Sequence, residues 1–144
     1  MSSELPKFPP YLYGTAWKAD ETRRLTRLAI QQGFRGIDTA NQRKHYFEAA
    51  VGEGIADAIR DGLIVSRDDL FLQTKFTHWR GQDDQMPYDE KAPIGTQVEQ
   101  SFASSQEHLA TEVVDSYVLH GPTSAKGLAS ADIEAWKAME EIHD

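Results

Sequence analysis

Four polar side chains in this sequence could together donate a proton to a substrate. Asp38, Lys75 and His120 each end a short apolar run, and Tyr46 lies in the loop that follows the first of these runs. In a βα barrel, residues at the carboxyl ends of the strands meet at one mouth. An ammonium beside a phenol stabilises the phenolate, a carboxylate fixes the ammonium, and an imidazole can hydrogen-bond an oxygen as it gains negative charge. The set therefore predicts a proton-donating site for carbonyl reduction.

Each of the four residues also has an ordinary structural explanation when it is taken singly. Asp38 could cap the next element, and Lys75 could be a solvated residue at a strand end. The ring of Tyr46 could simply pack against the core while its hydroxyl remains in water. His120, which precedes Gly-Pro, could belong to a turn. Their joint placement at successive strand ends is what favours the functional interpretation.

Alternating patterns along the chain predict the elements that would position these side chains. Strands are expected at residues 11–17, 34–40, 70–76 and 113–119, and helices at 22–32, 47–60, 95–109 and from a cap at Ser130 or Asp132 to residue 142. This order predicts a parallel sheet with right-handed crossovers. Four such units form either an open doubly wound sheet or half of an eight-unit barrel.

Two segments of the sequence carry no pattern of a helix or a strand. Residues 1–10 contain three prolines and read as an irregular lead-in. Residues 77–93 form a long polar stretch, and a loop of that length in a compact domain is usually functional or disordered. We expect this loop to shape any pocket at the carboxyl ends of the strands.

Composition excludes several classes of protein. The chain has 144 residues, 40% of them hydrophobic and 26% charged, which suits one packed domain. A net charge of −8 argues against a nucleic-acid partner, and the absence of cysteine excludes disulfides and thiolate metal sites. The five histidines form no metal-binding motif, and no metal is expected. No apolar run is long enough to span a membrane and the start lacks a signal peptide, so a cytoplasmic protein is expected.

Five segments, in order, resemble the N-terminal half of the aldo-keto reductases. They are residues 13–18, 33–40, 48–52, 69–75 and 114–122. The resemblance implies a partial TIM (β/α)8 barrel of about four βα units, with residues 11–144 as a truncated NADP-dependent oxidoreductase domain. It also implies that hydride passes from NADPH to a small aldehyde or ketone.

The resemblance assigns roles to individual residues. The catalytic residues that it implies are Asp38, Tyr46, Lys75 and His120. The residues that it implies for cofactor binding are Gly14, Thr15, Asp38 and Lys75. The residues that it implies for substrate binding are Trp17, Trp79 and His120.

The sequence departs from the family pattern in the loop before Tyr46. Five residues, 41–45, separate the strand from this tyrosine, and counting back from Val51 and Gly52 places the tyrosine slot on His45. We favour Tyr46 as the proton donor, because His45 has no phenol.

A larger departure is the end of the similarity at residue 144. The residues with which the family holds the nicotinamide amide and the adenosine phosphates would lie beyond it. We therefore expect an N-terminal fragment with little activity of its own. One alternative is a non-enzymatic half-barrel interaction module, or a degenerate paralogue, which pairs with itself or another chain through a bare sheet face. The other is an independent phosphate-binding open-sheet domain, which the absence of a Gly-rich loop disfavours.

Overall fold

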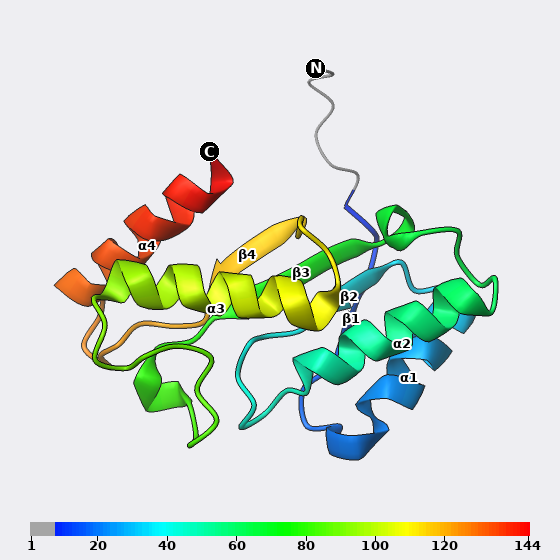
Figure 1. The fold of residues 1–144 in the computed structure, drawn as a ribbon, viewed down its shortest axis with the longest axis horizontal. Helices are drawn as coiled ribbons and strands as arrows, with labels where there is room; N and C mark the ends of the chain where they lie inside the picture. The colour runs from blue at the N-terminus through cyan, green and yellow to red at the C-terminus, as the bar shows by residue number, and fades with distance from the viewer. Residues whose placement is uncertain (1–7) are drawn as a thin grey trace.

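A four-stranded parallel sheet forms the centre of the protein (Figure 1). The computed structural model describes residues 8–144, so most of the predicted lead-in lies outside the described residues. The strands are β1 (Leu12–Gly14), β2 (Gly36–Asp38), β3 (Phe71–Phe76) and β4 (Ser116–Leu119). The helices are α1 (Thr22–Gln31), α2 (Glu48–Arg60), α3 (Ile94–Leu109) and α4 (Ser130–His143).

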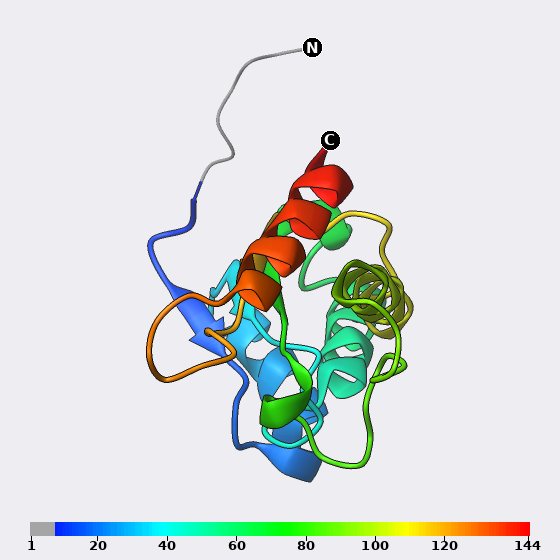
Figure 2. The same cartoon turned by 90° about the vertical axis from the view of Figure 1, so that its left-hand side faces the viewer.

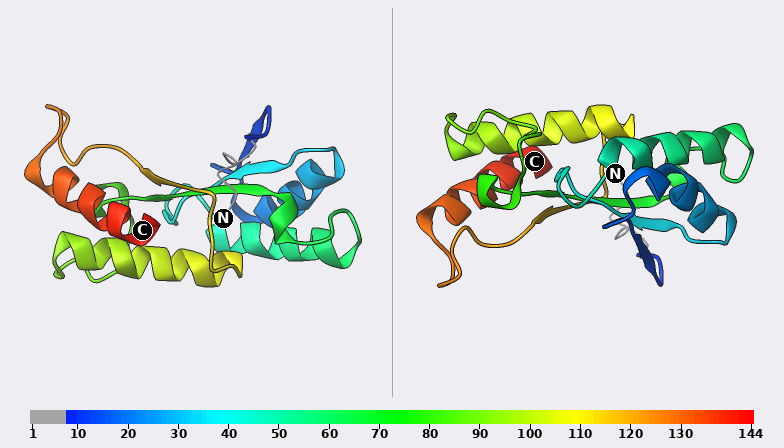
Figure 3. Two further views of the ribbon diagram at one scale, coloured as in Figure 1. Left: turned by 90° about the horizontal axis from the view of Figure 1, so that it is seen from above. Right: turned by 90° about the horizontal axis from the view of Figure 1, so that it is seen from below.

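The sheet has the strand order β1-β2-β3-β4, and every neighbouring pair is parallel. A helix follows each strand, and the helices lie along one side of the sheet (Figures 2 and 3). A doubly wound sheet would carry helices on both faces, whereas a barrel keeps them outside. The arrangement confirms the prediction of a partial (β/α)8 barrel.

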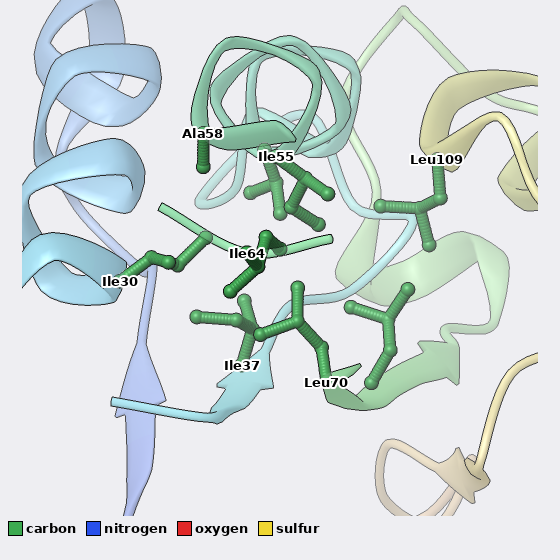
Figure 4. Close-up of a cluster of buried hydrophobic side chains, with 9 residues drawn as sticks. Ile30, Ile37, Ile55, Ala58, Ile64, Leu70 and Leu109 are labelled. Atoms are coloured by element: carbon green, nitrogen blue, oxygen red, sulfur yellow. The ribbon is translucent and has the colours of Figure 1, made fainter. Parts of the chain in front are cut away.

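Two apolar clusters join the helices to the sheet. In the first, Ile37 and Leu72 of the sheet pack against Ile30 of α1 and Ile55 of α2 (Figure 4). The second cluster lies under α3 and α4 and centres on Phe76, which is 1% exposed. Because alternate strand residues face opposite sides, the side chains between these apolar residues point to the uncovered face of the sheet.

A buried carboxylate connects α2 to its neighbours. Glu48 begins α2, and its carboxylate accepts hydrogen bonds from the hydroxyls of Thr74 and Ser105. The Nδ1 atom of His108 lies 2.8 Å from Oε1 of Glu48. Since these partners belong to β3 and α3, the carboxylate fixes the start of α2, two residues after Tyr46 in the chain.

The long segment after β3 is ordered by contacts with distant residues. It contains one 3₁₀ turn (Trp79–Gly81), and beyond it the hydroxyl of Tyr88 donates to the carbonyl of Thr77 at 2.7 Å. The Nε2 atom of Gln82 donates to the carbonyl of Asn41 at 2.9 Å. The segment is therefore packed against the loop that leads to Tyr46.

The structure corrects two details of the sequence interpretation. All four strands are shorter than predicted, and β1 pairs over only three residues. The N-cap residue of α4 is Ala129 and not Ser130, while Asp132 caps the helix from its third position. The carboxylate of Asp132 accepts the backbone N–H groups of Ala129 at 2.7 Å and Thr123 at 2.8 Å. Burial of Asp132 raises its pKa, but these hydrogen bonds outweigh the burial and leave the pKa below its usual value.

A glycine allows the chain to turn after α1. Gly33 follows α1 with a φ of 105°, which an L side chain rarely adopts, and so it turns the chain toward β2. No helix in the described part of the chain is long and apolar enough to cross a membrane.

Candidate active site

An ion pair between neighbouring strands forms the base of the site. Asp38 ends β2, and its register partner on β3 is Gln73, which places Lys75 one step further on the same face. The Nζ atom of Lys75 donates to Oδ1 of Asp38 at 2.7 Å and to the carbonyl of Thr39 at 2.9 Å. The two side chains are only 10% and 20% exposed. An ammonium has three donors, so one N–H of Lys75 remains for a third group.

Tyr46 and His120 complete a cluster around this ammonium. The Nζ atom of Lys75 lies 4.9 Å from the centre of the Tyr46 ring. The rings of Tyr46 and His120 meet edge to face, with centroids 5.8 Å apart. The backbone N–H of Tyr46 donates to the carbonyl of Gln42 at 2.9 Å, which closes the turn that brings the ring back over the sheet. The structure thus brings all four predicted groups together.

His120 is held just past the end of β4. Its backbone N–H donates to the carbonyl of Phe76 at 2.9 Å, and its Nδ1 atom lies 2.8 Å from the hydroxyl of Thr77. Burial lowers the pKa of His120 first of all, and the positive charge of Lys75 lowers it further. The imidazole is therefore neutral at neutral pH and can donate or accept a hydrogen bond.

Residues at the end of β1 leave space beside the ion pair. Thr15 is buried, and both its backbone N–H and its hydroxyl donate to the carbonyl of Asp38, at 3.2 Å and 2.8 Å. Gly14 is the register partner of Asp38, and no atom lies within 4 Å of the position that a Cβ would take. A flat group could therefore lie over Gly14, against the carboxylate.

The two tryptophans that the resemblance implies for substrate binding have different surroundings. Trp17 is 75% exposed and stacks on His45, with ring centroids 3.9 Å apart. Its backbone N–H also donates to the carbonyl of His45 at 2.8 Å. Trp79 is half exposed and lies under the guanidinium of Arg80. Within residues 8–144, no aromatic contact joins Trp79 to the cluster of four groups.

The sequence interpretation left the tyrosine slot open between two neighbours. The Tyr46 ring faces Lys75 and His120, whereas the His45 ring faces Trp17. The Nδ1 atom of His45 is buried without a hydrogen-bond partner among residues 8–144. The two rings thus contact different aromatic partners.

Gln73 and Ser116 belong to the site but were missed in the sequence. The Nε2 atom of Gln73 donates to Oδ1 of Asp38 at 2.9 Å, and the hydroxyl of Ser116 donates to Oε1 of Gln73 at 2.8 Å. A signal was available, because Gln73 interrupts an apolar run two residues before Lys75 and must share its face.

Comparison with known proteins agrees with this geometry. The model of the Aldo/keto reductase family matches residues 12–144. The chain belongs to this family. It is 34% identical over 139 residues to deoxymugineic acid synthase 1 of Hordeum vulgare, covering 88% of the chain and 40% of the relative. Aldo-keto reductase AKR2E4 of Bombyx mori is 34% identical over 135 residues, which cover 89% of the chain and 39% of the relative.

A solved structure of a family member has the same fold over most of the chain. The crystal structure of Bombyx mori AKR2E4 in complex with NADP superposes with a TM-score of 0.69 at 28% identity. The match covers 93% of this chain and 42% of the silkworm protein. The chain therefore spans about two fifths of the length of the relatives that it matches.

Proposed function

We propose that this chain carries the proton-donating part of an active site that reduces an aldehyde or ketone with hydride from NADPH. The observation that carries the proposal is the convergence of Asp38, Lys75, Tyr46 and His120 at one end of the sheet. Membership of the aldo/keto reductase family and the NADP complex of the silkworm relative support it. On this proposal, residues 11–144 act as one oxidoreductase domain.

The residues present fit a nicotinamide beside the ion pair. Gly14 leaves open space next to Asp38, where a planar ring could rest without meeting a side chain. Thr15 fixes the backbone of Asp38, while Asp38 and Lys75 offer an acceptor and a donor to the adjoining sugar. When bound, NADPH supplies the hydride that adds to the carbonyl carbon.

The side chains of the cluster supply the other half of the reaction. The neutral imidazole of His120 hydrogen-bonds the carbonyl oxygen and orients it. The phenol of Tyr46 donates the proton to that oxygen as charge develops on it. The ammonium of Lys75 stabilises the resulting phenolate, and the carboxylate of Asp38 holds the ammonium in place. The family resemblance alone supports a contact of Trp17 and Trp79 with the small-molecule substrate, since neither ring touches the four groups in this structure.

Replacing the phenol tests the assignment of the proton donor. We expect Tyr46→Phe to lower the rate of NADPH oxidation by an aromatic aldehyde about 10²–10⁴-fold, because general acid catalysis is lost. Binding of NADPH, measured by fluorescence titration, should stay nearly unchanged. Tyr11→Phe is the matched control, since Tyr11 is 73% exposed outside the cluster.

The neighbouring histidine provides the competing outcome. A normal rate in Tyr46→Phe together with a lost rate in His45→Phe would move the proton donor to His45. Normal rates in both variants would overturn the mechanism. The assay uses the 144-residue chain and the full reading frame that contains it. We expect low turnover from the chain alone, because it covers only 40% of deoxymugineic acid synthase 1.

A second candidate function is an interaction module that pairs with a second copy of the chain. The observation that favours it is the sheet itself, because β1 and β4 each have one edge without a partner strand in the described residues. The helices cover one face of the sheet and leave the other face bare (Figure 3). A second copy could supply the missing partner strands.

A further inference from the structure

One transverse row of residues, which includes Asp38 of the ion pair, crosses all four strands. Gly14 is aligned with Asp38, Asp38 with Gln73, and Gln73 with Ser116. Aligned residues on parallel strands point to the same face, so these side chains lie next to one another on the uncovered face of the sheet. Three of the four are polar.

The polar members of this row form a continuous hydrogen-bond chain. The hydroxyl of Ser116 donates to Oε1 of Gln73 at 2.8 Å, and Nε2 of Gln73 donates to Oδ1 of Asp38 at 2.9 Å. Lys75 donates to that same oxygen of Asp38 at 2.7 Å. Oδ1 of Asp38 therefore receives one charged donor and one neutral donor.

The direction of the chain fixes the amide of Gln73. A serine hydroxyl can donate to the amide oxygen, and this turns the NH₂ group of Gln73 toward the carboxylate. With the amide reversed, the oxygen of Gln73 would face the oxygen of Asp38 and that contact would become repulsive, whereas the hydroxyl of Ser116 could still accept from the NH₂ group. The carboxylate of Asp38 thus selects the orientation of the Gln73 amide, and Ser116 anchors the amide oxygen in that orientation.

The residue types in this row differ from those usual in barrels. Barrel interiors are filled mainly by branched apolar side chains such as valine, isoleucine and leucine. A polar amide at such a position costs free energy unless its hydrogen bonds are made. Here both ends of the Gln73 amide are satisfied, and one of them by a group of the proposed active site.

We propose that Gln73, whose amide oxygen is anchored by Ser116, is a positioning residue for the ion pair of Asp38 and Lys75. It acts through Asp38 and does not touch the substrate. By holding the carboxylate, it keeps the ammonium of Lys75 directed at Tyr46. The catalytic consequence rests on the proposed function, whereas the effect on the ion pair does not.

The ammonium of Lys75 can be observed directly by NMR in the 144-residue chain. In the wild type we expect a slowly exchanging ammonium signal with a through-hydrogen-bond coupling to the carboxyl carbon of Asp38. Gln73→Met keeps the length of the side chain and removes the amide. We expect about tenfold faster hydrogen exchange at Nζ and loss of the coupling, since a hydrogen bond to a charged group is removed.

Variants of the serine separate orientation from mere packing. Ser116→Ala should accelerate exchange at Lys75 by a smaller factor, because the oxygen of the Gln73 amide then loses the hydrogen bond that anchors it. Ser116→Thr retains a hydroxyl and should restore slow exchange. If Gln73→Met does not fold, the two serine variants still decide the question.

A second buried glutamine serves as the matched control. Gln97 of α3 is 2% exposed, and its Nε2 atom donates to the carbonyls of Glu90 and Ala92. Gln97→Met should lower stability without changing the Lys75 signal. Unchanged exchange in Gln73→Met, or equal effects of the two methionine variants, would overturn the positioning role. Failure of the Tyr46→Phe and His45→Phe assays would contradict only the proposed function, because the NMR result does not depend on turnover.

Discussion

Burial, together with the two opposite charges of the neighbouring ion pair, sets the protonation of His120. Burial and the ammonium of Lys75 lower its pKa, the charge of Asp38 raises it, and His45 lowers it slightly. The net pKa is below the ordinary value of an imidazole. A cation at this position would face the ammonium across the substrate site, so the neutral form suits a group that orients a carbonyl.

Removing the ammonium should reverse part of this effect. We expect Lys75→Met to raise the pKa of His120, because the repulsive charge is lost while the attraction of Asp38 remains. An NMR titration of the imidazole carbon signals measures the change in the 144-residue chain. Lys91→Met, at an exposed position outside the site, is the control and should leave the titration unaltered. A lower pKa of His120 in Lys75→Met would contradict the cluster geometry.

The same shift gives a sign for the dependence of stability on pH. The unfolded chain has an ordinary histidine, so it binds a proton at a higher pH than the folded chain does. Stability contributed by neutral His120 is therefore complete above about pH 6.5 and declines as the pH falls toward the folded pKa. The loss of stability at low pH should be smaller in Lys75→Met, because the pKa values of His120 in the folded and the unfolded chain are closer there.

Among the individual residues of the site, the sequence predicted the side chains that lie at strand ends. Asp38, Lys75 and His120 could be placed together because the carboxyl ends of parallel strands share one edge. Gln73 and Ser116 were not found, since their pairing depends on the register between β3 and β4. The apolar periodicity of one strand does not show which of its residues pairs with which residue of the next strand.

Close packing of α2 on α3 constrains the helices that carry the site. At Gly52, a Cβ would lie far inside van der Waals contact with the carbonyl oxygen of His108 and would also approach the backbone of Leu109. The absent side chain thus allows the two helices to touch. The contact lies one turn from Glu48, which holds the start of α2.

Filling this contact should destabilise the fold. We expect Gly52→Ala to lower the free energy of unfolding by about 1–3 kcal/mol, because backbone atoms must move apart. The measurement is urea denaturation followed by circular dichroism. Gly95→Ala is the control, since its Cβ would meet only the side chain of Ala138 at 3.8 Å, and it should not lower the free energy of unfolding. Equal stability of the two variants would contradict the described packing.

Helix and strand identity followed from the sequence more readily than their ends did. All four helices lie where apolar periodicity placed them, because each buries one face against the sheet. The strands are shorter, because pairing stops where a neighbour turns away, as β1 does after Gly14. Order in residues 77–93 comes from Gln82 and Tyr88, whose partners Asn41 and Thr77 could not be paired with them from spacing alone.

At the scale of the whole sheet, the outer edges of β1 and β4 have no partner strand among residues 8–144. The β1 edge carries exposed apolar side chains, among them Leu12 at 42% exposure and Tyr11 at 73%. Beside the β4 edge, α3, β4 and α4 enclose a groove of about 890 Å³ that Phe102, Trp136 and Ile142 help to line. Apolar surface at both ends of one sheet favours association of copies through these edges.

A charge placed at the β1 edge tests this association. We expect sedimentation velocity of the 144-residue chain to show a dimer that dissociates on dilution, and Leu12→Lys to shift it toward the monomer, because an ammonium blocks strand addition. Leu28→Lys is the matched control, since Leu28 has a similar exposure of 37% but lies on α1 and not on a strand. A wild-type chain that stays monomeric at every concentration, or equal effects of both lysines, would contradict pairing through the sheet. In that case the interaction module fails, while the ion pair of Asp38 and Lys75 remains to be judged by its own tests.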